Sequence, residues 1–162
     1  MGREEPRKIA TDEPAAAMQE DAVLRELLLG YCLKRSWLVI QAKVQKSLDA
    51  FSLRPAGFSA LVLICARPEM TQSQLASALS LERSNIVLII DDLEERGLIV
   101  RNRVEGDRRA YALNPTLAGM RFRDRVVKLV SEAEASLFDV LSSEEKEQLA
   151  SILARIEKAG TP

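Results

Sequence analysis

The chain has 162 residues, 47% of them hydrophobic, and its 23 basic and 24 acidic residues give a formal net charge of −1. This length and composition predict one soluble globular domain with helical extensions. Any affinity for nucleic acid must then come from a local arrangement of charge. The sequence contains no histidine, which excludes Ser-His-Asp and Cys-His catalysis and histidine-based metal sites. No cofactor is predicted.

The two cysteines, Cys32 and Cys65, lie far apart and have apolar neighbours. We expect them to be buried, reduced thiols of a cytoplasmic protein. An oxidant-sensing role for one of them is the alternative. No apolar run reaches the 18 residues of a membrane span, and the polar N-terminus is unlike a secretory signal. The sequence therefore predicts a cytoplasmic protein that does not contact a membrane.

The N-terminal half begins with a segment that has no apolar periodicity. Residues 1–17 mix charges with prolines and are expected to form a flexible arm. Apolar residues at helical spacing then predict one long amphipathic helix from about Met18 to about Leu48, in a segment covering 18–50. Pro55 is expected to open a second helix, which is apolar on nearly all sides and should be the central buried helix.

The middle of the chain, residues 51–114, has the pattern of a helix-turn-helix. Thr71 and Gln74 have the spacing of a capping box, which predicts a short helix from Gln72. After a break at Ser80, a stripe of isoleucines and leucine predicts a second helix that ends at Gly97. Partial alternation in residues 98–102 and 110–113 then predicts a β-hairpin.

The hairpin tip is unusually basic. Residues 101–111 read RNRVEGDRRAY and contain four arginines: Arg101, Arg103, Arg108 and Arg109. In a winged helix-turn-helix the second helix enters the major groove of DNA, and the hairpin tip reaches the backbone or the minor groove. Asp107 is expected to hold a neighbouring arginine in one pose. This arrangement predicts double-stranded DNA as the partner.

The C-terminal segment, residues 115–162, predicts two more helices. Pro115 is expected to start a long helix that ends near Leu141. Ser142 and Glu145 form the capping box of a last helix. The helices of 18–50 and 115–162 have more apolar positions than the central lobe can cover, which predicts a homodimer. The predicted fold class is mainly α with a small β-hairpin wing.

Residues 71–119 resemble the MarR-type winged-helix transcription regulators. The resemblance rests on LEERGLI at the end of the second helix, DRRAYAL in the wing, and a Pro-Thr-x-x-Gly helix start. It implies a homodimer with interlocked terminal helices and one DNA-reading lobe per subunit. Such a dimer binds a pseudo-palindromic operator, usually as a repressor.

The resemblance also implies which residues contact DNA. Ser84 and Asn85, at the start of the recognition helix, would face the groove, and Asn85 would pair with an adenine edge. Arg83 and Gln72 would reach phosphates. In the wing, Arg109 matches the family's DNA-contacting arginine, and Asp107 matches the acid that orients it.

One departure from the family pattern is Leu88, at a position where a basic residue is common. Residues 82–96 contain five acidic and two basic side chains, which disfavours deep insertion along phosphates. We therefore predict modest, strongly salt-dependent binding in which the wing contributes much of the affinity. The acidic helix also leaves open a winged-helix module that binds protein instead of DNA.

The resemblance further implies a small-molecule effector, often an aromatic acid or its thioester, such as a CoA derivative. It would bind between the dimer-forming helices and the DNA lobe and release the operator. Arg35 is the candidate partner for a carboxylate or phosphate. Tyr31 and Trp37 are candidates for stacking, and Phe51 and Phe58 for the pocket walls.

An enzyme is the least supported alternative. Its candidates for acid–base catalysis would be the acidic pairs 91–92 and 94–95. Adjacent side chains on a helix point about 100° apart and do not converge on one substrate atom. The sequence therefore does not predict an enzyme.

Overall fold

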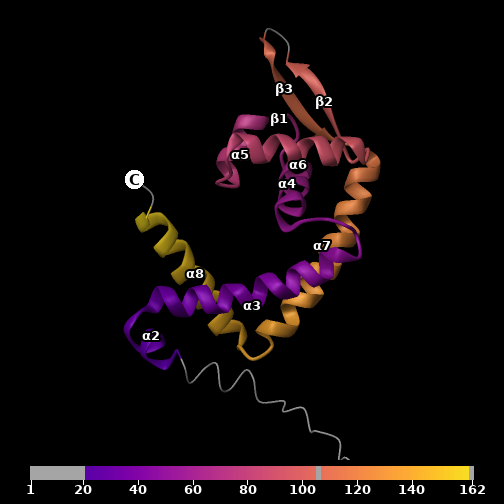
Figure 1. Cartoon of the computed structure of the whole chain (residues 1–162). Coiled ribbons are helices and arrows are strands. Elements are labelled where there is room, and N and C mark those ends of the chain that lie inside the picture. Colours follow the sequence, from indigo (N-terminus) through magenta and orange to yellow (C-terminus); the bar gives the residue numbers. More distant parts are fainter. Residues whose placement is uncertain (1–20, 105–106, 161–162) are drawn as a thin grey trace, which may run out of the picture. The chain divides into compact units, whose positions relative to one another are not determined.

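A computed structural model describes residues 21–104 and 107–160, with side chains for all of these except 104 and 107–110. The chain divides into two compact units, Met1–Val39 and Ile40–Pro162, and the boundary falls inside one helix. Each unit is described by itself (Figure 1). The arm predicted at residues 1–17 lies outside the described residues.

The first two described helices are α2 (Ala22–Leu27) and α3 (Leu29–Asp49). The prediction of one uninterrupted helix to Leu48 is therefore wrong at Leu28, whose backbone is extended (φ −129°, ψ 99°). The Leu28 amide closes α2 by donating to the Leu24 carbonyl (2.9 Å), and its own carbonyl accepts from the Tyr31 amide (2.9 Å). Apolar spacing continues across this residue, so periodicity gives no sign of the break.

The next three helices follow the predicted pattern. They are α4 (Pro55–Ala66), α5 (Gln72–Ala78) and α6 (Arg83–Glu95). Pro55 occupies the first turn of α4, and four residues of that helix are buried, as expected for the central helix. Thr71 and Gln74 form the predicted capping box. Gly97 has φ +66°, the left-handed conformation that ends a helix and that glycine adopts without strain.

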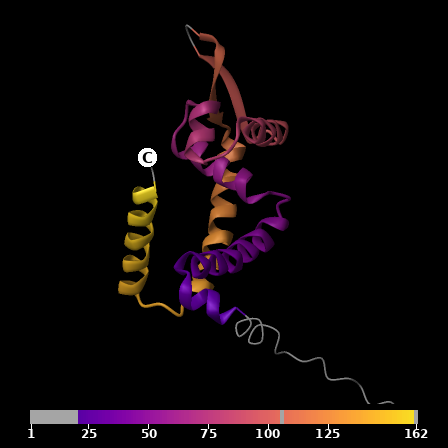
Figure 2. The same ribbon diagram turned by 60° about the vertical axis from the view of Figure 1, so that its left-hand side comes forward.

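A three-stranded antiparallel sheet contains the wing, with the order β1-β3-β2. Its strands are β1 (Met70–Thr71), β2 (Ile99–Val104) and β3 (Asp107–Pro115). The β2–β3 hairpin was predicted, and Figures 1 and 2 show it projecting beyond the helices of its unit. Strand β1 was not predicted because two residues have no detectable alternation. It pairs Met70 with Leu113 and so joins the start of α5 to the base of the wing.

The chain then continues into α7 (Leu117–Phe138) and α8 (Ser143–Gly160). The predicted start of α7 at Pro115 is wrong, because Pro115 ends β3 and Thr116 is the N-cap. The sheet extends this far since Pro115 lies opposite Ile99 in the ladder. The predicted capping box of α8 is confirmed: the Glu145 amide donates to Ser142 Oγ (3.3 Å), and the Ser142 amide donates to Glu145 Oε2 (2.7 Å).

The core of the second unit gathers one or more apolar side chains from each element between α3 and α7. Its largest fully buried side chains are those of Leu48, Leu61, Ile64, Leu75, Ile86, Ile90, Leu93, Ile99, Leu113 and Val126. Helix α8, by contrast, has no buried residue in this single chain. Among the described residues, no helix is long and apolar enough to cross a membrane.

Candidate nucleic-acid interface

The first turn of α6 presents polar side chains to solvent. Its apolar stripe, with Ile86, Ile90 and Leu93, is buried in the core. Arg83, Ser84 and Asn85 are consequently all exposed. Three of the sequence-predicted DNA residues are thus accessible to solvent in this turn. The fourth helical candidate, Gln72, is half-buried in the first turn of α5.

The break between α5 and α6 fixes the helix-turn-helix geometry. Ser80 takes a left-handed conformation with φ +52°. The Leu81 amide then donates to the Ala76 carbonyl (3.0 Å), which closes the turn. Helix α6 starts two residues later, with its first turn free of acidic side chains. The N-cap residue is Glu82, whose side chain forms no capping hydrogen bond, so the first-turn amides of α6 can donate to an anion such as phosphate.

The four wing arginines predicted to contact DNA lie at different places along the hairpin. Arg103 is exposed near the end of β2. Asp107, Arg108 and Arg109 begin β3, and Asp107 pairs with Val104 next to a register irregularity. The side chains of these three residues lie outside the described part, so the predicted contact between Asp107 and an arginine is not described. Their backbone places them at the far end of the hairpin (Figures 1 and 2).

Arg101, the fourth predicted wing arginine, is held against the recognition helix. Its guanidinium forms an ion pair with Asp91, and its Nε lies 3.3 Å from Glu94 Oε2. Its backbone amide also donates to Glu94 Oε1 (3.2 Å). The side chain is only 26% exposed. Arg101 therefore links β2 to α6. The sequence signal for this contact was the i, i+3 spacing of the two acids, which places them on one helix face.

A second arginine ties the end of α6 to two other segments. The Arg96 guanidinium donates to the backbone carbonyls of Phe51 (2.8 Å) and Ser52 (3.1 Å) in the α3–α4 connection. It also lies 5.3 Å from the centre of the Phe122 ring on α7 and 3.6 Å from Asp92. Sequence reasoning missed this role, because the α3–α4 connection and α7 are distant from Arg96 in sequence.

These contacts change how the charge of α6 should be counted. Of the five acidic residues between 82 and 96, Asp91 and Glu94 are paired with Arg101, and Asp92 is paired with Arg96. The excess of acid inferred from the sequence counted only the arginines within the helix itself. The pairing of Asp91 and Glu94 with an arginine outside the helix lowers the repulsion that α6 would exert on phosphates.

The Pro-Thr-x-x-Gly motif anchors α7 on the base of the wing. The Thr116 hydroxyl donates to the Gly97 carbonyl (2.7 Å) and accepts from the Gly119 amide (2.9 Å). A Cβ on Gly119 would lie 1.9 Å from the Leu98 carbonyl oxygen, well inside van der Waals contact. The close approach of the two backbones therefore requires glycine at this position.

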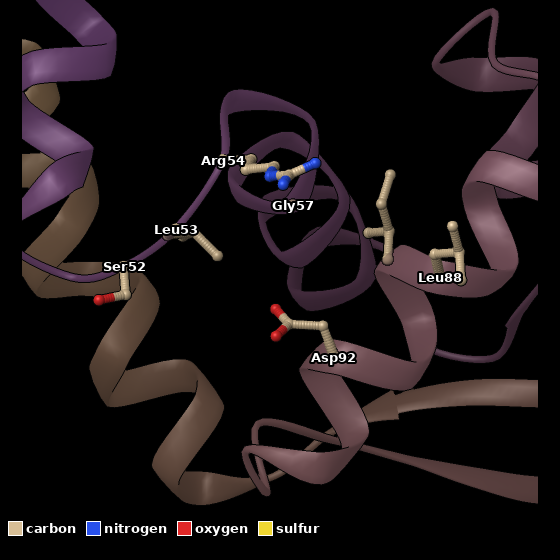
Figure 3. Close-up of a pocket in the computed structure, with 7 residues that line it drawn as sticks. Ser52, Leu53, Arg54, Gly57, Leu88 and Asp92 are labelled. Atoms are coloured by element: carbon tan, nitrogen blue, oxygen red, sulfur yellow. The ribbon is translucent and has the colours of Figure 1, made fainter.

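A hollow of about 290 Å³ opens between the start of α4 and the outer face of α6 (Figure 3). Its lining residues are Ser52, Leu53, Arg54, Gly57, Leu88, Ile89 and Asp92. Figure 3 shows the Asp92 carboxylate pointing into the gap, with Arg54 on the opposite side. None of the five predicted ligand residues lines this hollow.

In the first unit, the predicted effector residues Tyr31 and Arg35 converge on a carboxylate that the sequence did not single out. Asp21 accepts hydrogen bonds from Arg25 Nε (2.5 Å) and the Tyr31 hydroxyl (2.8 Å), and it lies 3.5 Å from Arg35 Nε. The hydrogen bond from Arg25 is the largest cause that lowers the pKa of Asp21. The hydrogen bond to Asp21 raises the pKa of Tyr31.

The remaining predicted effector residues are the aromatic side chains Trp37, Phe51 and Phe58. Trp37 is 58% exposed and lies about 200° around α3 from Arg35, on the opposite side of the helix. In the second unit, Phe51 packs edge-on against Phe122 with ring centres 5.5 Å apart. Phe58 is half-buried against the core of that unit. The roles of these three residues in ligand binding stay predictions.

Both cysteines are half-buried and free in the described structure. The Cys32 thiol donates to the Arg25 carbonyl at 3.3 Å. Burial raises the pKa of Cys65, which disfavours the reactive thiolate. Among the described residues, no group of three or more cysteine, aspartate or glutamate side chains is placed to hold a metal ion.

Comparison with known proteins identifies the family. Residues 53–111 match the family model described as MarR family. A protein of Thauera aromatica, named for transcriptional regulation of the hcr operon, is 31% identical over 129 residues, which cover 79% of this chain and 78% of that protein. The chain belongs to the MarR family. Its MarR-family relatives are transcription regulators, and the winged-helix fold predicted from the sequence is confirmed.

Two solved MarR-family structures are especially informative. The transcriptional repressor CouR bound to a 23-mer DNA duplex is 38% identical, has a TM-score of 0.79, and covers 85% of this chain and 96% of its own. CouR from Rhodococcus jostii RHA1 bound to p-coumaroyl-CoA is 32% identical, has a TM-score of 0.73, and covers 81% of this chain and 92% of its own.

Proposed function

We propose that this MarR-family chain is a homodimeric repressor that binds a pseudo-palindromic operator and is released by a small anionic effector. The observation that supports DNA binding best is the exposed first turn of α6, with Arg83, Ser84 and Asn85 all accessible to solvent, together with an arginine-bearing wing. The CouR structure bound to a DNA duplex supports the same interpretation, because its fold matches most of this chain.

In this proposal the first turn of α6 reads bases and the wing binds the backbone. Asn85 has the paired donor and acceptor that match an adenine edge, and Arg83 would contact a phosphate. Leu88 is exposed one turn after Ser84, where it would contact thymine methyl groups instead of phosphate. Arg103 and Arg109 would contact DNA from the wing, whereas Arg101, engaged with Asp91 and Glu94, would hold the wing in position.

The dimer is proposed to form through the segments 18–50 and 115–162, with residues 51–114 as the DNA-binding lobe. Helix α8 leaves Ile152, Leu153 and Ile156 between 41% and 46% exposed. An apolar groove of about 420 Å³ lies beside them, formed by α7 and α8. In the first unit, Leu27 and Leu29 are more than 70% exposed. Apolar surface of this kind needs a partner, and the second copy of the chain supplies one.

The effector is proposed to be an aromatic acid or its CoA thioester. The relative CouR was solved with p-coumaroyl-CoA, and Arg35 and Tyr31 of this chain offer donors suited to an anion. An effector that binds the non-DNA-binding state of the dimer more tightly would release the operator through this difference in affinity.

The protein-binding alternative loses its main support. It rested on the acidic face of α6, and three of those acids are paired with arginines of the same chain. The oxidant-sensing alternative has the half-buried Cys32 as its candidate. If Cys32→Ser abolished an oxidant-triggered release from DNA, that alternative would replace the effector proposal.

The decisive experiment is a salt-titrated shift assay with the full chain and the DNA upstream of its own gene. We expect saturable binding of one dimer that is lost in Arg109→Ala. The matched control is Lys128→Ala, which removes one exposed charge from α7 outside the helix-turn-helix and wing. Absence of binding at low salt, or equal loss in both variants, would contradict the proposed function.

The dimer is tested separately by sedimentation. Leu153→Glu with Ile156→Glu places two charges on the exposed apolar stripe of α8 and should shift the protein to monomer. Ser151→Glu, which adds a charge to an exposed residue about 160° around the helix from Leu153 and about 140° from Ile156, should leave the dimer intact. A dimer that survives the double substitution would place the interface elsewhere.

A further inference from the structure

The α2–α3 junction contains a compact cluster of donors around a single acceptor. Two guanidiniums, from Arg25 and Arg35, and the hydroxyl of Tyr31 all face the carboxylate of Asp21. That carboxylate is only 12% exposed. The cluster as a whole has one negative and two positive charges.

The cluster has more donor capacity than its internal carboxylate uses. An arginine offers five N–H donors in a planar fork that matches carboxylate and phosphate oxygens. Asp21 takes one hydrogen bond from Arg25 and an ion pair with Arg35 at 3.5 Å. The Arg35 side chain is 39% exposed and accessible to a dissolved anion.

The backbone next to Asp21 is weakly held, so its carboxylate can move away from the arginines. Asp21 precedes α2, which has only six residues and no buried residue. An isolated helix of this length has little stability of its own. The extended residue Leu28 separates α2 from α3, so Arg35 and Tyr31 are held by a different helix from Arg25.

We propose that Arg25, Tyr31 and Arg35 form the anion-binding part of the effector site, and that Asp21 occupies it as an internal ligand when no effector is bound. The effector's anionic oxygens, from a carboxylate or a phosphate, displace the Asp21 carboxylate and take over its donors. This deepens the effector part of the proposed function and rests on it. Asp21 thereby sets a threshold, because an anion must outcompete a carboxylate that is always present.

The test measures anion binding to the full-length protein by calorimetry, without DNA. The probes are coenzyme A, which supplies phosphates, p-coumarate, which supplies a carboxylate, and pantetheine, which has neither. Asp21→Asn keeps the shape of the side chain and removes its charge. We expect this variant to bind the anion that uses the site roughly fivefold more tightly, and pantetheine unchanged. Arg35→Gln should weaken binding of the same anion by about tenfold.

The matched control is Glu26→Gln on α2. It removes the same charge from an exposed residue next to Arg25 that has no hydrogen bond or ion pair with the described residues of the cluster. An equal gain in both variants would attribute the effect to overall charge and would overturn the proposal. A loss of anion binding in Asp21→Asn would show a purely structural role and would overturn it too.

The probe that responds identifies the source of the anion. Tighter binding of coenzyme A alone assigns the site to phosphate, and tighter binding of p-coumarate alone assigns it to carboxylate. No response to either anion in wild type or variant refutes the anion site. The shift assay with operator DNA is independent of these measurements, so failure of DNA binding and failure of this site are distinguishable.

Discussion

Replacing Arg101 by alanine tests whether this wing arginine contacts DNA or holds the wing against the recognition helix. The sequence suggested that Arg101 contacts DNA, but its guanidinium is paired with Asp91 and lies beside Glu94 on the recognition helix. We therefore expect Arg101→Ala to weaken DNA binding by loosening the wing, without removing a phosphate contact. The number of ions released on binding should then stay the same.

The magnitude follows from the exposure of the three side chains. Arg101 is 26% exposed, Asp91 52% and Glu94 41%. Partly exposed ion pairs contribute about 0.2–1 kcal/mol each, which gives at most about 1 kcal/mol of wing positioning per subunit after allowance for solvent screening. Two subunits bind one operator, so the loss is at most about 2 kcal/mol, or roughly thirtyfold in Kd.

The assay is operator binding at several salt concentrations. Loss of one phosphate contact in each subunit would reduce the slope of log K against log salt by about 1.8. We expect this change in Arg103→Ala, whose side chain is exposed near the wing tip, and an unchanged slope in Arg101→Ala. If Arg101→Ala flattened the slope as much as Arg103→Ala, Arg101 would be a phosphate contact and the positioning argument would fail.

A double-mutant cycle on the free energy of unfolding tests the pair without DNA. Arg101→Ala and Asp91→Asn should each destabilise the protein, and the double substitution should cost less than the sum by about 0.5 kcal/mol or more. Strict additivity would mean that the two side chains do not interact in solution.

Three further predictions concern stability. Gly119→Ala should destabilise the protein by roughly 3 kcal/mol or more in urea unfolding, because the added Cβ would overlap the Leu98 carbonyl. Gly30→Ala, where no described atom lies within 4 Å of the added Cβ, should be neutral or stabilising. Equal effects of the two substitutions would refute the close approach of Gly119 to Leu98. Thr116→Ala should lower the free energy of unfolding by about 1–2 kcal/mol, because it removes the N-cap of α7. Thr116→Ser should retain most of the stabilisation that this cap provides. The pKa of Asp21 is lowered on folding, so this carboxylate stabilises the folded protein fully above its ordinary pKa of 3.8, and the stabilisation is lost as the pH falls below that value. Asp21→Asn should therefore show a smaller loss of unfolding free energy on acidification than the unsubstituted protein. An identical dependence of the unfolding free energy on pH in the two proteins would contradict this.

The sequence determined most of the local structure, because local signals were strong. Pro55, the capping box at Thr71 and the left-handed Gly97 each act within a few residues, so helix starts and ends in the helix-turn-helix were readable. The alternation of polar and apolar residues in α6 determined which side is buried. For that reason the exposure of Arg83, Ser84 and Asn85 could be predicted without a structure.

Tertiary structure decided the contacts between residues that are distant in the chain. Strand β1 exists because Met70 and Thr71 pair with Leu113 and Ala112. Helix α7 starts after Thr116, whose hydroxyl caps the helix and donates to the Gly97 carbonyl. Arg101 looked like one more basic residue of the wing, and only the fold shows that it faces acids on α6.

The same reason explains the cluster at the α2–α3 junction. Periodicity identifies an apolar face, but it carries no information about a single extended residue such as Leu28. That residue turns α2 back so that Asp21 meets Tyr31, ten positions away, and Arg35, fourteen positions away. Such a meeting depends on the path of the backbone and not on the spacing of residue types along one helix.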